Sequence, residues 1–221
     1  MGVITRVMTA DPVCSLTFDD GPDPVWTPKV LEILREYRAR ATFFMVGEGA
    51  VIYPDIVERV ARDGHAIGNH SWSHLAFPLI PLVEQWKQIR KCQSVIMPYG
   101  QRLFRPPYGM NNTKSNMLAF LQGFKTIGWS FSPEDWCEVS SKVIEKRIVK
   151  NIKAGSIFLL HDRLFDKGKP IKGPKNVREA LIDREPMLFA LNEVLRKLKG
   201  KIQFVTIPEL LSRGRPQREK W

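Results

Sequence analysis

Seven short apolar segments alternate with segments of helical periodicity along this chain of 221 residues. Strands are predicted at residues 13–18, 41–46, 66–68, 103–104, 125–129, 156–160 and 203–207. Strands that alternate with helices are typical of a parallel sheet covered by those helices. The predicted strands are continuously apolar, as strands buried on both faces are. We therefore predict an α/β fold. The pattern is consistent with either an open doubly wound sheet or a barrel.

Helices are predicted between the strands, with bounds set by proline, asparagine and glycine. Pro28 and Pro54 occupy first helical positions, Asn112 is an N-cap, and Gly64 and Gly123 mark C-terminal ends. The predicted helices cover residues 28–38, 54–63, 82–97, 113–121, 141–153 and 186–199, with a short helix from residue 208. We expect one domain, residues 1–212, followed by a mobile basic tail at residues 213–221.

The composition restricts the partners of the protein. Lys and Arg number 34 and Asp and Glu number 23, so the formal net charge is +11. Such a surplus favours an anionic partner or substrate. The chain has no helix-turn-helix, zinc-finger or RNP motif, so we expect no nucleic acid to bind. No apolar run approaches the roughly 20 residues of a membrane span, and no oligomeric state is predicted.

Residues 1–12 and the cysteines carry an expectation about location. Residues 1–12 lack the apolar core of a signal peptide. Cys14, Cys92 and Cys137 are odd in number and lack the spacing of a metal site. We therefore expect reduced cysteines and a cytoplasmic location, with secretion as the alternative if a signal is removed before residue 1.

Chemically active side chains follow the predicted strands at their C-terminal ends. In a parallel barrel these ends share one face, where active sites are built. No Gly-x-Gly-x-x-Gly follows the first strand, which argues against a dinucleotide-binding fold. His65 precedes a strand and is expected to be structural. The residues that follow strands are Asp19, Asp20, His70, His74, Arg105, Asp135 and His161.

Asp20, His70 and His74 form a candidate metal site. Histidines at i and i+4 can lie on one side of a turn and share an ion. With one carboxylate they make a two-histidine, one-carboxylate set that leaves coordination positions open, as in a catalytic zinc site. A divalent ion held there would activate a water molecule near neutral pH.

The remaining polar residues suit acid–base chemistry. Asp19, next to the ligand Asp20, is expected to act as the general base for that water. Arg105 would hold Asp19 ionised and oriented. His161 would protonate the leaving group, and Asp135 would fix the tautomer of His161 and favour its cationic form.

Five segments in order resemble the motifs of the polysaccharide deacetylases, the family-four carbohydrate esterases with a nodulation-type chitooligosaccharide deacetylase domain. The resemblance covers about residues 3–211, and five motifs in order are highly specific. The segments are Thr17-Phe18-Asp19-Asp20-Gly21-Pro22, His70-Ser71-Trp72-Ser73-His74, Arg105-Pro106-Pro107-Tyr108-Gly109, Asp135-Trp136 and Leu159-Leu160-His161-Asp162.

The resemblance implies a distorted, TIM-barrel-like (β/α) barrel of about seven parallel strands. It implies the roles already given to the acids and histidines, with Zn²⁺ as the usual metal and Co²⁺ or another divalent ion as an alternative. The backbone N–H of Tyr108 would help to hold the oxyanion. Trp136 and Leu159 would form the walls of the pocket for the acetyl methyl group, although plain core packing also accounts for both. Ser132 departs from the family, many members of which carry an acid there.

The predicted function is the metal-dependent removal of N-acetyl groups from an amino sugar or chitooligosaccharide-like glycan, with release of acetate. The alternatives are an acetyl esterase on an O-acetylated glycan, a deformylase or deacetylase of a lipid-linked sugar, and a non-catalytic glycan-binding relative. Residues 163–178 carry six basic side chains and one acid, so this loop is either a solvated segment or a guide for an anionic sugar substrate.

Overall fold

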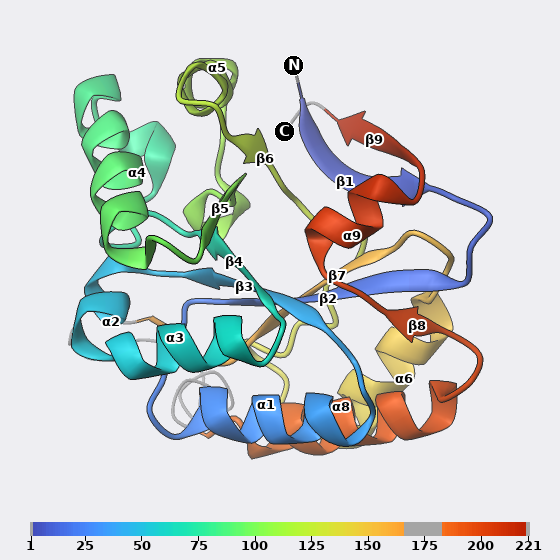
Figure 1. The fold of residues 1–221 in the computed structure, drawn as a ribbon. Helices are drawn as coiled ribbons and strands as arrows, with labels where there is room; N and C mark the ends of the chain where they lie inside the picture. Colours follow the sequence, from blue (N-terminus) through green and yellow to red (C-terminus); the bar gives the residue numbers. More distant parts are fainter. Residues whose placement is uncertain (1, 166–182, 220–221) are drawn as a thin grey trace.

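The computed structural model describes residues 2–165 and 183–219, and its centre is a parallel sheet (Figure 1). The order of the strands is β6-β5-β4-β3-β2-β7, and β8 also pairs with β2. All of these pairings are parallel. The seven predicted strands are therefore confirmed as β2 (Val13–Asp19), β3 (Ala41–Met45), β4 (Ala66–Asn69), β5 (Gly100–Phe104), β6 (Lys125–Thr126), β7 (Ile157–His161) and β8 (Gln203–Phe204).

The sheet curls into a half-barrel, and residues 127–131 bridge the space between its two outer strands. Beyond β6, Phe131 forms a parallel bridge with Phe158 of β7. The N–H of Leu159 donates a hydrogen bond to the carbonyl of Phe131, and the N–H of Ser130 donates to the carbonyl of Ile157. This closure confirms the distorted barrel and excludes the open doubly wound sheet.

A second, two-stranded sheet joins the two ends of the described chain. β1 (Val3–Met8) pairs antiparallel with β9 (Arg215–Glu219). The prediction of a mobile tail is therefore wrong for residues 215–219, because their backbone groups pair with β1. β1 was also missed. It lies near the N-terminal ends of the barrel strands, where the N–H of Val7 donates to the carbonyl of Gly155. A side chain at Gly155, which has φ +76°, would lie 1.7 Å from the carbonyl oxygen of Val7.

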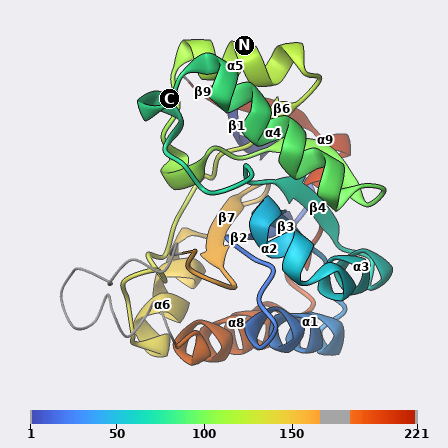
Figure 2. The same cartoon turned by 90° about the vertical axis from the view of Figure 1, so that its left-hand side faces the viewer.

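Helices cover the outer side of the sheet (Figure 2). In this view α1, α6 and α8 lie on one side of the strands, and α4 and α5 lie on the opposite side. The predicted helix ends agree with the structure to within about two residues, and Asn112 caps α5 by accepting a hydrogen bond from the N–H of Ser115. The helices are α1 (Trp26–Glu36), α2 (Gly47–Ile52), α3 (Pro54–Arg62), α4 (Leu82–Ile96), α5 (Thr113–Leu121), α6 (Ser141–Asn151), α8 (Glu185–Leu198) and α9 (Ile207–Ser212), with 3₁₀ turns at Phe77–Leu79 and Pro107–Gly109.

Apolar side chains form the core of the barrel. Ile4 and Val7 of β1 belong to a buried apolar cluster with barrel residues such as Phe44 and Leu103. Near the N-terminal ends of β3 and β4, His65 accepts a hydrogen bond from the N–H of Ala41, and burial lowers its pKa to about 4. Its predicted structural role is confirmed.

The cysteines are unpaired, as predicted, with Cys14 and Cys92 buried and Cys137 partly exposed. Within residues 2–165 and 183–219, no helix has the length and apolar character needed to cross a lipid bilayer.

Candidate active site

A cavity of about 430 Å³ opens at the C-terminal ends of the barrel strands. Arg105 and Asp135 do not line it, because both are buried behind its wall. The structure therefore brings the predicted site residues together in two layers, one facing the cavity and one supporting it. The cavity is lined by Asp19, Asp20, His70, His74, Tyr108, Gly109, Trp129, Ser132, Glu134, Trp136, Leu159, His161, Leu164 and Phe165.

Asp19 and Asp20 reach the same cavity although they are adjacent in sequence. Side chains alternate along a strand, so Asp19 lies on the same face of β2 as Thr17. Asp20 follows the last residue of β2 and has φ +73°, a left-handed conformation that is uncommon for a residue with a side chain. This turn brings the second carboxylate into the site beside the first.

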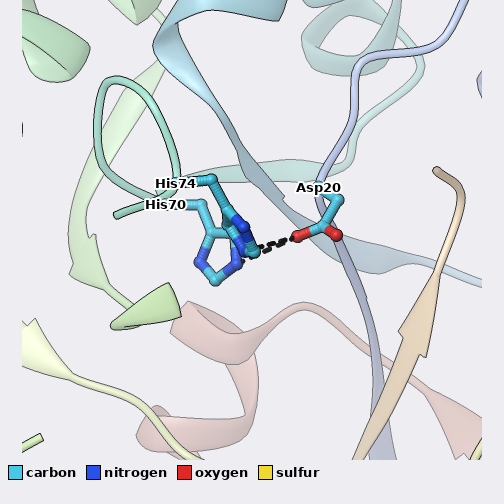
Figure 3. A group of neighbouring side chains, drawn as sticks. All are labelled: Asp20, His70 and His74. Carbon is cyan, nitrogen blue, oxygen red and sulfur yellow. Dashed lines mark ion pairs between the residues drawn. The ribbon is translucent and has the colours of Figure 1, made fainter. Parts of the chain in front are cut away.

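The two histidines come from the loop after β4, and their rings point towards Asp20 (Figure 3). Nε2 of His70 lies 3.2 Å from Oδ1 of Asp20, and Nε2 of His74 lies 3.1 Å from the same oxygen. One ligand atom from each residue lies within 4.8 Å of the others, and all three side chains are buried. The predicted metal ligands therefore form a compact group.

The hydrogen bonds of this group fit a bound cation. Nδ1 of His70 donates to the carbonyl of Arg105 at 2.8 Å, so in neutral His70 the lone pair of Nε2 faces the carboxylate of Asp20. An electron pair that faces a carboxylate oxygen is repelled unless a proton or a cation lies between them. Burial opposes ionisation of Asp20, but His74 and His70 hold its pKa well below the usual range. Nδ1 of His74 is buried and has no hydrogen-bond partner among the described residues.

The loop that carries the histidines is fixed from α4. Oε1 of Gln88 accepts a hydrogen bond from the N–H of Ser73 at 2.9 Å. The side chain of Asn69 donates to the carbonyl of Ile89 and accepts from the N–H of Ser71. These bonds hold the backbone on both sides of His70.

Arg105 supports the site from within the barrel. It is fully buried, and its guanidinium lies 4.1 Å from the ring centre of Phe44. Nη1 lies 2.6 Å from Oδ1 of Asp19 and 2.7 Å from Oγ1 of Thr17. Nε and Nη2 donate to the carbonyls of Ile127 and Gly128, so every part of the guanidinium is engaged. The predicted pairing of Arg105 with Asp19 is present.

The predicted pair of His161 and Asp135 is also formed. Nδ1 of His161 lies 3.0 Å from Oδ1 of Asp135, and Oδ2 of Asp135 accepts from the backbone N–H of His161 at 2.9 Å. Burial opposes the charged form of both residues. Even so, the charge of Asp135 raises the pKa of His161, and His161 and Arg184 lower the pKa of Asp135.

Arg184, which the sequence reasoning missed, lies behind this pair. Its Nη2 forms an ion pair with Oδ2 of Asp135, and its Nη1 donates to the carbonyl of Asp135 at 2.9 Å. Nε and Nη2 also lie 3.2 and 3.1 Å from the carbonyl oxygen of His161. Arg184 stands between two acids in the sequence, a setting typical of a solvated surface, so no local signal marked it.

The residues predicted to contact substrate occupy the wall and rim of the cavity. Leu159 is buried, whereas Trp136 and Tyr108 are exposed at the rim. Tyr108 has φ +60°, and the centre of its ring lies 4.4 Å from that of His74. Ser132 lines the cavity where many relatives were expected to carry an acid. The roles of Tyr108, Trp136 and Leu159 in binding stay predictions.

The basic loop at residues 163–178 lies largely outside the described residues. Its first three residues are described, and Leu164 and Phe165 line the cavity. The N–H of Phe165 donates to Oδ2 of Asp20 at 3.0 Å, and the side chain of Arg163 donates to the carbonyl of Pro22 at 3.2 Å. The proposed guidance of an anionic substrate stays a prediction.

The sequence is similar to those of known deacetylases. The family model for polysaccharide deacetylases matches residues 6–127. A peptidoglycan-N-acetylglucosamine deacetylase of Bacillus cereus is 35% identical over 216 residues, which is 95% of this chain and 93% of the relative. A chitooligosaccharide deacetylase of Azorhizobium caulinodans is 40% identical over 166 residues, 73% of this chain and 79% of the relative.

Solved structures agree with this comparison. The crystal structure of the peptidoglycan N-acetylglucosamine deacetylase Bc1960, in complex with a hydroxamate, has a TM-score of 0.82 and 31% identity, and the match covers 96% of this chain and 94% of that chain. A family-four pseudoenzyme of Bacillus anthracis matches with a TM-score of 0.75 at 23% identity, over 96% of this chain and 69% of that chain, which shows the fold alone.

The fold and the site thus define a family-four carbohydrate esterase. The chain belongs to the polysaccharide deacetylase family. The predicted enzyme class, a deacetylase of N-acetylated sugars, is confirmed at the level of the family. Because a pseudoenzyme has the same fold, activity must be argued from the residues of this chain rather than from its shape.

Proposed function

We propose that this protein hydrolyses the N-acetyl group of an amino sugar within a chitooligosaccharide-like or related glycan and releases acetate. One observation carries the proposal. In the register of β2 and β7, Asp19 pairs directly with His161, so a candidate base and a candidate acid stand side by side next to the Asp20, His70 and His74 group. Hydrolysis of an amide needs these functions together, because water must lose a proton and the departing amine must gain one.

Asp20, His70 and His74 would hold the metal, for which Zn²⁺ is the proposed ion and Co²⁺ the first alternative. A divalent ion there supplies Lewis acidity, which polarises the carbonyl group and favours ionisation of water. The open side of the group faces the cavity, where substrate can approach.

Asp19 takes the proton of the attacking water. Its carboxylate is oriented for this step by the 2.6 Å ion pair with Arg105. His161 lines the cavity and gives a proton to the nitrogen as the bond to the acetyl carbon breaks, with Asp135 behind it. The backbone N–H of Tyr108 would stabilise the oxyanion. Leu159 and Trp136 would enclose the acetyl methyl group, and the exposed aromatic faces of Tyr108 and Trp136 suit stacking against a sugar ring.

The comparison of amide and ester substrates tests the proposal. We expect acetate release from N-acetylglucosamine oligomers, loss of this activity on chelation, and recovery with Zn²⁺. Activity confined to O-acetylated xylan would identify the acetyl esterase instead. No hydrolysis of either class by metal-loaded protein would leave a glycan-binding relative, and binding of the same oligomers would then be measured.

The unpaired cysteines support a reducing compartment as the location of the protein.

A further inference from the structure

Arg184 and its partners form a buried cluster that the roles given above do not use. The residue is 1% exposed, and its guanidinium contacts the side chain and backbone of Asp135 as well as the carbonyl of His161. The partners lie 49 and 23 residues away in the sequence. A buried charge in so many specific contacts is costly to keep unless the geometry is well satisfied, which points to a role in holding these two residues.

The contacts divide the carboxylate of Asp135 between two tasks. Oδ2 accepts from the N–H of His161 and from Arg184, while Oδ1 faces Nδ1 of His161. With Oδ2 fixed by two donors, the carboxylate cannot rotate away from the imidazole. The guanidinium also joins the loop after β6 to the last residue of β7, since it donates to the carbonyls of both Asp135 and His161.

We propose that Arg184 is a positioning residue for proton donation: it fixes the carboxylate of Asp135 so that the imidazole of His161 is aimed into the cavity. When His161 gives up its proton, the guanidinium also keeps Asp135 from becoming an uncompensated buried charge. The inference rests on the proposed function, because it assigns the acid role to His161.

The test compares two substrates that differ in their need for an acid. An N-acetylated sugar has a poor amine leaving group, whereas 4-nitrophenyl acetate releases a phenolate that needs no proton. In Arg184→Met we expect kcat on the N-acetylated oligomer to fall by about 10- to 100-fold, less than the roughly 10²–10⁴-fold that general acid catalysis contributes, because the acid itself is still present. KM, metal content and turnover of the aryl ester should change by less than about two-fold. Arg184→Lys keeps the positive charge but lacks the planar guanidinium, so its kcat on the amide should lie between those of wild type and Arg184→Met.

Arg147 provides a matched control. Its Nη1 donates to the carbonyl of Pro133 at 2.9 Å and its guanidinium lies near Glu134 and Glu138, so it holds the same loop from α6 without contact to Asp135 or His161 in the described structure. Arg147→Met should lower the melting temperature and leave kcat on both substrates unchanged. If Arg184→Met does not fold, Arg184→Lys alone decides between the outcomes.

Equal losses on the amide and the ester in the folded Arg184 variants would overturn the inference, because they indicate a general structural defect. So would a kcat on the amide that stays within about two-fold of wild type below the melting temperature. A wild-type enzyme that does not cleave the N-acetylated oligomer would contradict the proposed function instead, so the two failures are distinguishable.

Discussion

The backbone carbonyl of Arg105 accepts a hydrogen bond from Nδ1 of His70 at 2.8 Å, while the side chain of the same arginine pairs with Asp19. One residue therefore orients both a candidate ligand and the candidate base, through different groups. A carbonyl can only accept, so it fixes the tautomer of His70 in which Nε2 is free to bind a cation. This separation of roles makes the metal and the base independently testable.

Asp19→Asn should retain metal and lose turnover. The amide keeps the size of the side chain and removes the basic oxygen, so kcat should fall by roughly 10²–10⁴-fold. Metal content measured by elemental analysis should match wild type. As a control, Asp20→Asn should lose metal as well as activity. Near-normal turnover in metal-loaded Asp19→Asn would mean that another group is the base.

His74→Ala should weaken metal binding by removing one of three ligands. Nε2 of His74 lies 3.1 Å from the oxygen of Asp20 that also faces His70, so two ligands remain to hold the ion. We expect sub-stoichiometric metal after dialysis and a larger dissociation constant in competition with a chelator. His65→Ala is the control, because this histidine lies away from the site. Equal metal retention in both variants would contradict the ligand assignment.

Asp135→Asn should shift the alkaline limb of the kcat profile to lower pH. The carboxylate of Asp135 raises the pKa of His161, so the imidazolium persists to higher pH in wild type. Without that charge the proton is lost earlier, and the donating form disappears at lower pH. The profile is measured from pH 5 to 10. Glu134→Gln removes an exposed acid at the cavity rim and should leave the limb in place. A limb that does not move in Asp135→Asn would show that the pair is uncoupled.

Asp162→Asn should flatten the dependence of stability on pH. Oδ2 of Asp162 accepts from the hydroxyl of Thr27 at 2.5 Å, Oδ1 has no partner among the described residues, and burial raises its pKa from 3.8 to about 7. The folded state then binds the proton more tightly than the unfolded state. The contribution of Asp162 to the free energy of unfolding is therefore fully present below pH 4. It is lost as the pH rises towards 7, and the loss is on the order of 4 kcal/mol.

The measurement for Asp162 is the free energy of urea unfolding at pH 5 and pH 8, in wild type and variant. The loss between the two values should be smaller in Asp162→Asn, since an amide carries no charge at either pH. Asp183→Asn, an exposed acid, is the control and should follow wild type. Equal slopes in Asp162→Asn and wild type would show that the carboxyl group does not titrate in this range.

Deletion of residues 214–221 should lower stability and leave chemistry intact. The deletion removes the pairing of β9 with β1, and with net contributions near 1 kcal/mol for each hydrogen bond the loss is roughly 2–5 kcal/mol. No residue of β1 or β9 lines the cavity, so kcat at 25 °C should not change. Deletion of residues 220–221 alone is the control. An unchanged free energy of unfolding in the longer deletion would mean that β9 does not support the barrel.

The barrel strands and the residues at their ends were predictable because the signal is local. Continuous apolar runs such as residues 156–160 identify buried strands. In a parallel barrel the residues that follow these runs all lie at the same end of the barrel. This reasoning predicts Asp19 and His161 in one site, and the register of β2 and β7 pairs the two residues directly. Proline and asparagine gave the helix starts, since they act within a single turn.

The missed features depend on contacts made across the chain. β9 is Arg-Pro-Gln-Arg-Glu, a segment with no apolar face, and it is a strand only because β1 offers a free edge. α2 has two glycines among its first three residues, which disfavours a helix locally. Its first N–H groups, at Gly47 and Glu48, donate to the carbonyls of Ser71 and Trp72 in another loop. Arg184 is identified by partners remote in sequence. For β9, α2 and Arg184 alike, tertiary contacts determine the structure, and local sequence does not indicate it.

The pairing of Val3 with Glu219 brings the ends of the described chain side by side (Figure 1). A short glycine-rich linker could span this gap, so the chain could be circularised and reopened at another surface turn. The turn at Gly200, which has φ +76° and open space around its α-carbon, is a suitable place for new termini. No residue of β1, of β9 or of the turn at Gly200 lines the cavity, so a chain rearranged in this way should keep its site.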